Sequence, residues 1–357
     1  MSLASLADQA LRLEREGRKV VRLNVGNTNL PTPPAAVERA IRALRESPSG
    51  HYESAAGSPE LLHLIAGREG CGTENVVIGP GSKMLIWGLL SILCERGEIV
   101  STPAPYWPAY ALAAESQGLR FQPVPTRLEE GWRFSVSDIP EAKLFILCNP
   151  HNPTGIVLDD GRVDEIMERC RDGRIHLIID EAYKGLAFRP IPRYEGAIRV
   201  RSFSKEFSLE SWRLGYAVAP AAVAERLVSF ISRTATCVPR FVQEAGIACL
   251  EHESEIRAAR GSAWRSRSET LQGELAKRGF RFAAPGSGMY VFAAREDIID
   301  SESFCRERLE RTGIAIAPGN AYGGYERFVR ICANQPDDVL ENAVAAIDGR
   351  PSAEDSP

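Results

Sequence analysis

Short apolar segments alternate with amphipathic segments through the middle of the chain. Their length and their Val, Ile and Leu content are typical of strands that are covered on both faces. These segments are 75–78, 99–102, 119–124, 143–148, 175–180, 198–203 and 214–219. Helical periodicity lies between several of them, most clearly at 82–96 and 159–171. This order predicts an α/β domain with a mostly parallel sheet.

The pattern changes after residue 240. Residues 241–279 have helical periodicity, with a candidate break at Gly261. Further along we expect, in order, strand 289–292, helix 301–312, a strand near Ala315, strand 327–332 and a helix after Pro336. We therefore predict four parts: 1–30 packing with the small domain, a large α/β domain over 31–240, a small α+β domain over 241–350, and a disordered tail over 351–357.

Composition and charge narrow the class of protein. The 357 residues suit one large and one small domain, with the ordinary globular content of 44% hydrophobic residues. A net charge of -4 and the absence of basic runs argue against nucleic acid or an anionic membrane surface as partners. We find neither a membrane-spanning segment nor a secretory signal. Scattered cysteines and histidines predict a reduced, cytoplasmic protein without a metal site.

Two predicted strands end in polar residues that suit a ligand site. Segment 175–180 ends in Asp180, with Tyr183 close behind. A carboxylate at the carboxyl end of a parallel strand can pair with a cationic ligand atom, although taken alone Asp180 is more simply a helix cap. Segment 143–148 runs into a Pro- and Gly-bounded turn that can fix Asn152 as a hydrogen-bond donor, although such turns are common.

A lysine and a glycine-rich turn are the other candidates. Lys205 directly follows a strand, and its amine can form an imine if it is kept deprotonated. Arg213, eight residues later, can clamp a phosphate, and so can the N–H groups of the turn at 79–82. That turn lacks the spacing of a dinucleotide-binding loop or a P-loop. Each residue by itself is more often an ordinary surface or turn residue.

Together, and in this order, the motifs resemble those of the fold-type I aminotransferases of class I and II. The shared motifs are the Gly-Ser turn at 81–82, Asn-Pro-Thr-Gly at 152–155, Asp-Glu-Ala-Tyr at 180–183, Ser-x-Ser-Lys at 202–205 and Arg-x-Gly-Tyr at 213–216. Segments 23–27, 52–61, 313–319 and 327–331 also match, so the resemblance covers nearly the whole chain. It implies a seven-stranded, mostly parallel sheet in the large domain and pyridoxal 5′-phosphate as the cofactor.

The resemblance also implies a role for individual residues. Lys205 would carry the cofactor as an imine and shuttle a proton, Asp180 would pair with the ring nitrogen, and Tyr183 would bind the 3-oxygen. Arg330 would clasp the substrate carboxylate, whereas Arg327 is expected to be solvated. The remaining implied cofactor contacts are Gly81, Ser82, Lys83, Trp107 (with Tyr106 as the alternative), Asn152, Ser202, Ser204 and Arg213. Gly26 and Asn152 are implied substrate contacts.

Three further residues bear on assembly and local backbone. Tyr52 in this family reaches the cofactor phosphate of the other subunit, which implies a homodimer with shared active sites. The chain departs from the family pattern at Ser211, where Gly is usual, and at Ser208, where Gly is frequent. Because serine disfavours a left-handed backbone, we expect the local turn to differ there.

Ping-pong transfer of an amino group between an L-α-amino acid and a 2-oxo acid is the leading hypothesis. Elimination, lyase or cyclase reactions on the same scaffold would use the same residues. Two hypotheses lie outside this class: a transcription regulator, which needs a DNA-binding segment, and a nucleotide-binding protein that uses the turn at 79–82. The substrate stays open. Arg233 or Arg240 would suit an acidic side chain, and Tyr106, Trp107 or Tyr322 an apolar one.

Overall fold

A seven-stranded sheet forms the centre of the computed structural model, which describes residues 3–46 and 50–348. Its strands lie in the order β2-β8-β7-β6-β5-β3-β4, and β8 is antiparallel to both neighbours while the other pairs are parallel. Their bounds are β2 Val76–Gly79, β3 Ile99–Ser101, β4 Arg120–Phe121, β5 Leu144–Cys148, β6 His176–Asp180, β7 Ile198–Ser202 and β8 Gly215–Val218. The predicted strands and the mostly parallel sheet are confirmed.

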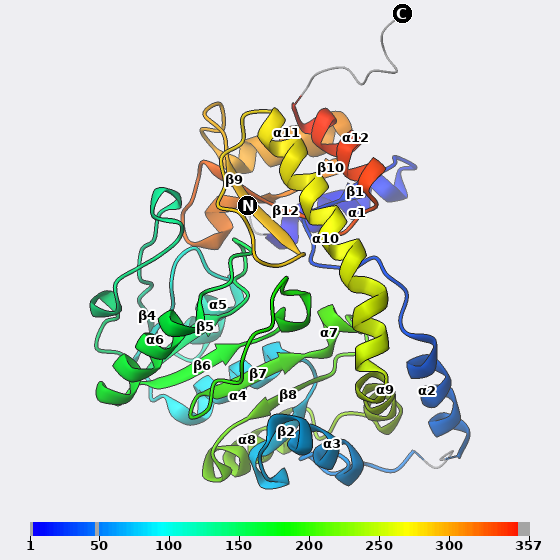
Figure 1. Cartoon of the computed structure of the whole chain (residues 1–357), viewed down its shortest axis with the longest axis vertical. Coiled ribbons are helices and arrows are strands. Elements are labelled where there is room, and N and C mark those ends of the chain that lie inside the picture. The colour runs from blue at the N-terminus through cyan, green and yellow to red at the C-terminus, as the bar shows by residue number, and fades with distance from the viewer. Residues whose placement is uncertain (1–2, 47–49, 349–357) are drawn as a thin grey trace, which may run out of the picture.

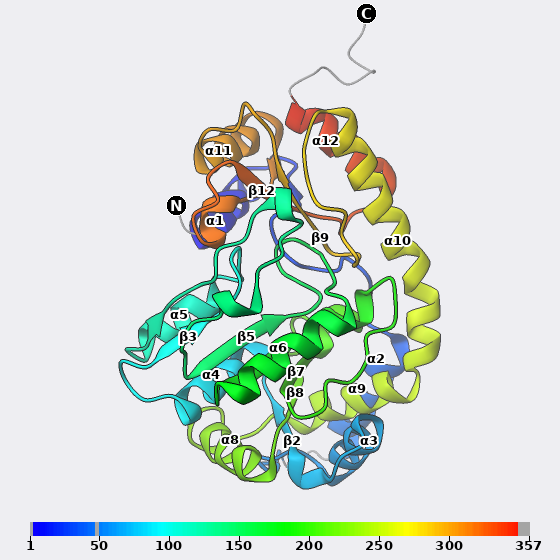
Figure 2. The same ribbon diagram turned by 60° about the vertical axis from the view of Figure 1, so that its left-hand side comes forward.

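Helices cover both faces of this sheet (Figures 1 and 2). Side chains alternate along β5: Leu144 and Ile146 pack into one apolar cluster, and Phe145 and Leu147 into another. On the first face lie α4 Ser82–Leu93, α5 Ala109–Ser116 and α8 Ala221–Thr234; on the second lie α2 Pro34–Glu46, α3 Pro59–Glu69, α6 Asp160–Asp172 and α9 Arg240–Glu251. Burial on both faces explains why these strands are apolar at nearly every position.

The C-terminal elements form a separate layer above the large sheet in Figure 1, and the N-terminal elements join them. Strands β11 Ala317–Pro318, β12 Phe328–Cys332 and β9 Tyr290–Ala294 make an antiparallel sheet, and β1 Val21–Arg22 pairs in parallel with β10 Ile314–Ala315. The helices of this layer are α1 Leu3–Arg15, α10 Glu253–Lys277, α11 Ser301–Thr312 and α12 Asp337–Asp348. One apolar core contains residues from α1, α10, α11 and α12.

The proposed division of the chain at residues 30 and 240 stays a prediction, and helix α9, which begins at Arg240, still packs against the large sheet. Leu6 and Leu23 share their core with C-terminal residues such as Val329, and not with the large sheet. The predicted tail, 351–357, lies outside the described residues. The short helices are α7 Phe203–Glu206 and the 3₁₀ turns Thr73–Asn75, Leu128–Glu130, Val136–Asp138, Lys184–Leu186 and Gly319–Tyr322.

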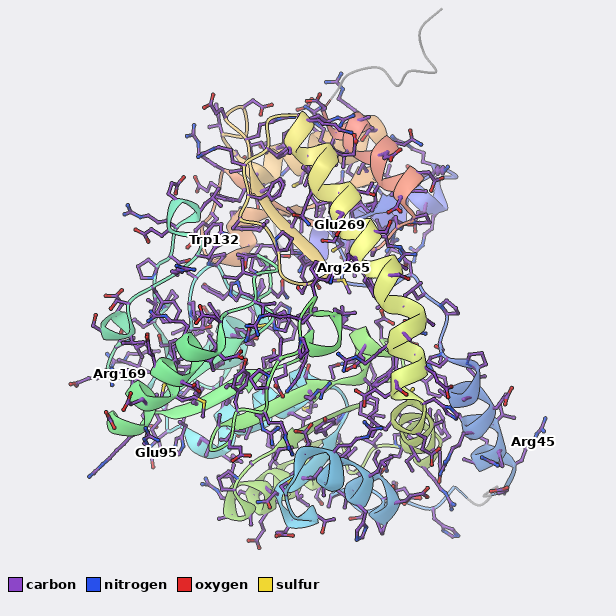
Figure 3. The ribbon with its side chains drawn as sticks, in the orientation of Figure 1. Arg45, Glu95, Trp132, Arg169, Arg265 and Glu269 are labelled. Carbon is purple, nitrogen blue, oxygen red and sulfur yellow. The ribbon has the colours of Figure 1, made fainter. Side chains whose placement is uncertain are left out.

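The long helix α10 connects the two layers and contradicts one expectation. Helix α9 ends at Glu251 and α10 begins at Glu253, so the break lies at His252, and the predicted break at Gly261 is wrong. A glycine costs a helix only about 1 kcal/mol relative to alanine. Burial of Trp264 and Leu271 in the following turns holds the helix together past that point. Arg265 and Glu269 mark this part of α10 in Figure 3.

An aromatic contact also joins the layers. Trp132 (Figure 3) belongs to the connection between β4 and β5, and its ring centroid lies 5.7 Å from that of Phe292 in β9 and 5.3 Å from that of Phe328. Trp132 and Phe292 are both buried. No helix within the described part of the chain is long and apolar enough to cross a bilayer.

Candidate active site

A cavity of about 600 Å³ opens where three parallel strands end. Strands β5, β6 and β7 finish at Cys148, Asp180 and Ser202, and ligands of open α/β sheets collect at such carboxyl ends. The predicted residues that line this cavity are Gly26, Ser82, Lys83, Trp107, Asn152, Asp180, Tyr183, Ser202, Ser204, Lys205, Arg213 and Arg330. Segments more than 300 residues apart in the sequence, such as those of Gly26 and Arg330, therefore meet at one place.

Lys205 projects into the cavity from the short helix α7, directly after β7. Ser202 caps this helix by accepting a hydrogen bond from the Ser204 N–H at 3.2 Å. The Lys205 Nζ donates to the carbonyl oxygen of Gly26 at 2.5 Å. Burial lowers the pKa of the Lys205 ammonium below its usual value, with the Glu210 carboxylate opposing this effect. A lowered pKa raises the fraction of neutral amine, which is the nucleophilic form.

Buried ion pairs hold the backbone on both sides of Lys205. Arg201 donates to the Glu206 carboxylate at 2.8 Å, and these two residues lie on either side of the lysine in sequence. Arg199 pairs with Glu69, which also accepts from the Tyr216 hydroxyl at 2.6 Å. Breaking a buried ion pair usually costs several kcal/mol, so this network restrains the lysine segment.

Asp180 is a buried carboxylate that suits a cationic ligand atom. It accepts hydrogen bonds from the Tyr110 hydroxyl at 2.7 Å and from the Ala182 N–H at 3.0 Å. Within residues 3–46 and 50–348, no cationic side chain forms an ion pair with it. Burial raises the pKa of the Asp180 carboxyl to about 6, although both hydrogen bonds favour the ionised form. A protonated ring nitrogen would supply the missing positive charge, so Asp180 fits the predicted cofactor.

Four side chains of the cavity form a connected group. Arg330 donates from Nη1 to Asn152 Oδ1 at 3.0 Å and from Nη2 to the Asn24 carbonyl at 2.7 Å. Asn152 Nδ2 donates to the Tyr183 hydroxyl at 3.2 Å, and this hydroxyl lies 3.0 Å from that of Tyr290. The arrangement places a guanidinium, a carboxamide and two phenols at the cavity, which suits binding of a carboxylate and a ring oxygen.

The part of the cavity beside Gly81 and Arg213 suits a phosphate. Gly81 has φ of +82°, a conformation that glycine adopts freely, and an added Cβ would collide with the Arg213 guanidinium. Ser82 begins α4, so free N–H groups of the helix start face this part. Arg213 donates from Nη1 to the Glu210 carbonyl at 2.8 Å, and within the described residues it forms no ion pair with a carboxylate. A glycine cradle beside an unpaired arginine fits a phosphate group.

Of the two aromatic candidates for the ring face, Trp107 lines the cavity and Tyr106 does not. The Trp107 indole packs edge-on against Tyr110, with 5.4 Å between ring centroids. The Lys83 ammonium lies 5.3 Å from the centre of the Trp107 ring. Tyr106 instead packs against Phe121 at 4.9 Å.

The backbone at the two unusual serines differs from our expectation at one of them. Ser208 adopts a left-handed conformation with φ of +55° although it carries a side chain, whereas Ser211 does not. The Ser208 hydroxyl is buried and accepts hydrogen bonds from Thr28 Oγ1 at 2.8 Å and Arg260 Nη1 at 3.0 Å. These bonds offset the steric cost of the left-handed backbone.

Other candidates lie away from the cavity. Tyr52 is 87% exposed. Arg327 is exposed, in keeping with the expectation that it is solvated, and Arg240 pairs with Glu244 at 3.7 Å. Arg233 donates to the Ser229 carbonyl within its own helix. Neither Arg233 nor Arg240 lines the cavity of its own chain.

Sequence reasoning missed Tyr110, Asn24 and Tyr290, which all line the cavity. Tyr110 lies three residues after Trp107 at the start of a helix. Residues at this spacing lie on the same face of a helix, so the spacing was a usable signal for Tyr110. Asn24 lies in segment 23–27, which matches the family, but no role was expected for its side chain, and Tyr290 belongs to none of the motifs. Their place depends on pairing between the N-terminal segment, β10 and β12, which no local pattern shows.

Comparison with known proteins identifies relatives of the whole chain. The profile of the family described as aminotransferase class I and II matches residues 18–347. The aspartate aminotransferase of Thermococcus kodakarensis is 34% identical, over 88% of this chain and 85% of the relative. Among solved structures, the aspartate aminotransferase from Thermus thermophilus with maleate has a TM-score of 0.91 at 25% identity, covering 98% of this chain and 96% of the other. The aromatic aminotransferase from Pyrococcus horikoshii has a TM-score of 0.87 at 27% identity, covering 96% and 98%.

Proposed function

This chain belongs to the class I and II aminotransferases, which depend on pyridoxal phosphate, and we propose that the cavity at the ends of β5, β6 and β7 is its active site. The reaction is transfer of an amino group between an L-α-amino acid and a 2-oxo acid, in two half-reactions. One observation carries the assignment of the site. Lys205, whose ammonium pKa is lowered, lines the same cavity as the buried carboxylate Asp180. Within the described residues, no cationic side chain forms an ion pair with Asp180.

Different residues of the cavity would bind different parts of the cofactor. Gly81, Ser82, Ser202, Ser204 and Arg213 would hold the phosphate, and Trp107 would cover the ring. Asp180 would keep the ring nitrogen protonated, and Tyr183 and Asn152 would hydrogen-bond the ring oxygen. When bound, pyridoxal phosphate supplies an electron sink for the carbanion at the substrate α-carbon.

Lys205 and Arg330 handle the amino acid. Arg330 Nη1 and Nη2 each use one hydrogen for the oxygens of Asn152 and Asn24, and the remaining N–H groups of the guanidinium would hold the α-carboxylate and fix the substrate near Gly26. The Lys205 Nζ is the group that would attach the cofactor. As a free amine beside the bound substrate, Nζ would accept the proton from the substrate α-carbon as a general base.

Replacement of the lysine tests this assignment. Lys205→Ala should lower amino transfer by about 10²- to 10⁴-fold or more, because both the covalent link and the base are lost. Mass spectrometry after borohydride reduction should find the cofactor on Lys205 in the wild type and no cofactor mass on the variant. Lys277→Ala, an exposed lysine at the end of α10, is the matched control. Turnover at the wild-type rate in Lys205→Ala would refute the assignment.

The proposed amino donor is dicarboxylic, such as aspartate. The relative from Thermococcus kodakarensis carries the name aspartate aminotransferase. The resemblance gave Lys83 as a cofactor contact, but Lys205, Arg213 and Arg330, the other cations of this cavity, already have roles, so we propose Lys83 for the second carboxylate instead. Its ammonium lies beside Trp107 and forms no ion pair within the described residues, so it is free to meet a second carboxylate.

A comparison of donors tests the substrate. Wild-type kcat/KM should be higher for aspartate than for alanine or phenylalanine. Lys83→Gln should lower kcat/KM for aspartate by about 10- to 100-fold, the usual worth of a charged hydrogen bond, and leave alanine nearly unchanged. Arg240→Gln is the control outside the cavity. A preference for phenylalanine, or an equal loss with alanine, would contradict this substrate.

The proposed assembly is a homodimer with shared sites. Tyr52 is exposed on the isolated chain, and the neighbouring helix α2 exposes Ile41 and Leu44. Such exposed apolar side chains are typical of surfaces that another protein covers. A cytoplasmic location is also proposed, which the eight free cysteines support.

A further inference from the structure

Tyr290 is a cavity residue to which the roles above assign nothing. It begins β9 and is only 3% exposed. Its hydroxyl lies 3.0 Å from that of Tyr183, and a Cβ added at Gly26 would collide with it. The same added Cβ would lie 3.7 Å from the Lys205 Nζ, so the Tyr290 hydroxyl lies among Tyr183, Gly26 and the lysine amine.

The hydrogen bonds around Tyr183 indicate which hydroxyl donates in the contact between Tyr183 and Tyr290. A phenol has one proton to donate and can accept from other donors. The Tyr183 oxygen already accepts from Asn152 Nδ2 at 3.2 Å. If Tyr183 donates its proton to a cofactor oxygen in the cavity, the proton of the 3.0 Å contact must come from Tyr290. Burial raises the pKa of the Tyr290 hydroxyl to about 12, so it keeps that proton at neutral pH.

The ring of Tyr290 has a second contact, with Arg330. The guanidinium carbon lies 4.2 Å from the Tyr290 ring centre, and 5.0 Å from that of Tyr322 on a second side. Contacts of this kind attract a cation to the face of a ring and hold the guanidinium in place. Tyr290 therefore touches both the phenol proposed for the ring oxygen and the arginine proposed for the substrate carboxylate.

We propose that Tyr290 is a positioning residue of this active site, whose hydroxyl donates to Tyr183 and commits the Tyr183 proton to the cofactor oxygen, and whose ring holds Arg330. The inference rests on the proposed function, because it takes Tyr183 as the donor to that oxygen. Donation from Tyr290 polarises the Tyr183 O–H group and strengthens the bond it gives in turn. Tyr290 thus favours the form of the bound cofactor that carries negative charge on this oxygen.

The pH dependence of the bound cofactor's visible spectrum tests the hydroxyl. In Tyr290→Phe the Tyr183 hydrogen bond weakens, so the charged oxygen loses stabilisation and the spectral midpoint moves to higher pH. We expect a shift of a few tenths to about one pH unit, the size of one neutral hydrogen bond. Tyr322→Phe is the matched control: it removes a hydroxyl that has no hydrogen-bond partner within the described residues, from the other ring facing Arg330, and should leave the midpoint unchanged.

A double-substitution cycle separates the proposed route from a general disturbance. If Tyr290 acts through Tyr183, Tyr290→Phe should add no further shift in a Tyr183→Phe background. Tyr290→Leu, which removes the ring, should raise KM for the amino donor several-fold, whereas Tyr290→Phe should leave KM close to the wild-type value. This split distinguishes loss of the hydroxyl from loss of the ring.

Three results would overturn the inference: an unchanged midpoint in Tyr290→Phe with cofactor bound, an equal shift in Tyr322→Phe, or an undiminished shift in the Tyr183→Phe background. None of these would touch the proposed function if the wild type still attaches the cofactor to Lys205 and transfers amino groups. Failure of the function itself would show in the Lys205→Ala comparison, independently of Tyr290.

Discussion

At the scale of single residues, the environment of Asp180 decides its chemistry. The carboxyl group is 2% exposed and receives two hydrogen bonds, yet its pKa rises to about 6 because burial outweighs them. The surrounding protein therefore makes the isolated carboxylate unfavourable. A bound cation is what this position lacks, and a protonated ring nitrogen would meet that need.

The raised pKa makes a prediction for the cofactor-free protein. The folded carboxyl, with a pKa of about 6, binds its proton more tightly than the unfolded one near 3.9. Its contribution to stability is therefore full below about pH 4 and is lost as pH rises through about 6. The asparagine of Asp180→Asn has no proton to lose. The free energy of unfolding of this variant, relative to that of the wild type, should therefore rise by on the order of 2 kcal/mol between pH 4 and pH 7.

Denaturant unfolding of both cofactor-free proteins across this pH range measures the gain. Cofactor affinity should change in the opposite direction to stability. Asp180→Asn should bind pyridoxal phosphate about 10- to 100-fold more weakly than the wild type, because a charged hydrogen bond is lost. Parallel pH dependences of the two cofactor-free proteins would contradict the burial argument.

At the scale of elements, the segment after β1 is hydrogen-bonded to the loop that follows Lys205. Thr28 Oγ1 donates to Ser208 Oγ, the Thr28 N–H donates to Glu210 at 2.6 Å, and Thr32 Oγ1 donates to the Ser208 carbonyl at 3.1 Å. Arg260 of α10 joins the same group through Ser208. The segment also contains Gly26, which accepts from Lys205, so these hydrogen bonds help to set the position of the lysine amine.

Two substitutions at Ser208 separate its hydroxyl from its backbone conformation. Ser208→Ala keeps the left-handed strain and leaves buried partners unsatisfied, so it should destabilise the protein by about 1–3 kcal/mol. Ser208→Gly loses the same hydroxyl but relieves about 1–2 kcal/mol of left-handed strain, so its loss should be smaller. The denaturation midpoints of the two variants compare their stabilities. A glycine variant that is less stable than the alanine variant would refute the strain argument.

At the scale of the whole molecule, one predicted site residue, Tyr52, does not line the cavity of its own chain. Tyr52 is exposed, whereas the other predicted residues line the cavity or, like Gly81, adjoin it. A closed twofold dimer would place the same surface of each subunit against the other, so one exposed residue can serve the partner's site. Such a dimer would explain why Tyr52 belongs to a family motif and yet does not line the cavity of its own chain.

Mixing two inactive variants tests the shared sites. Lys205→Ala and Tyr52→Ala homodimers should each have low activity. In a mixed dimer one site lacks both residues and the other regains both, so random exchange should recover about a quarter of the wild-type activity. Lys205→Ala mixed with the doubly substituted chain should recover nothing. No recovery in a sample that native mass spectrometry shows to contain mixed dimers would refute the shared site.

The sequence by itself determined the strands and most helices, and it predicted Asp180, Asn152, Lys205 and Arg213 as site residues, which line one cavity in the fold. These features depend on side-chain periodicity and on motifs a few residues long, which local chain geometry controls. Tertiary structure alone decided three others. Tyr290 meets Tyr183 across 107 residues of sequence, α10 continues through Gly261 because its neighbouring turns are buried, and Ser208 is left-handed because distant Thr28 and Arg260 bond its hydroxyl. Each depends on contacts between segments that no local pattern brings together, since their energy comes from packing in the folded chain.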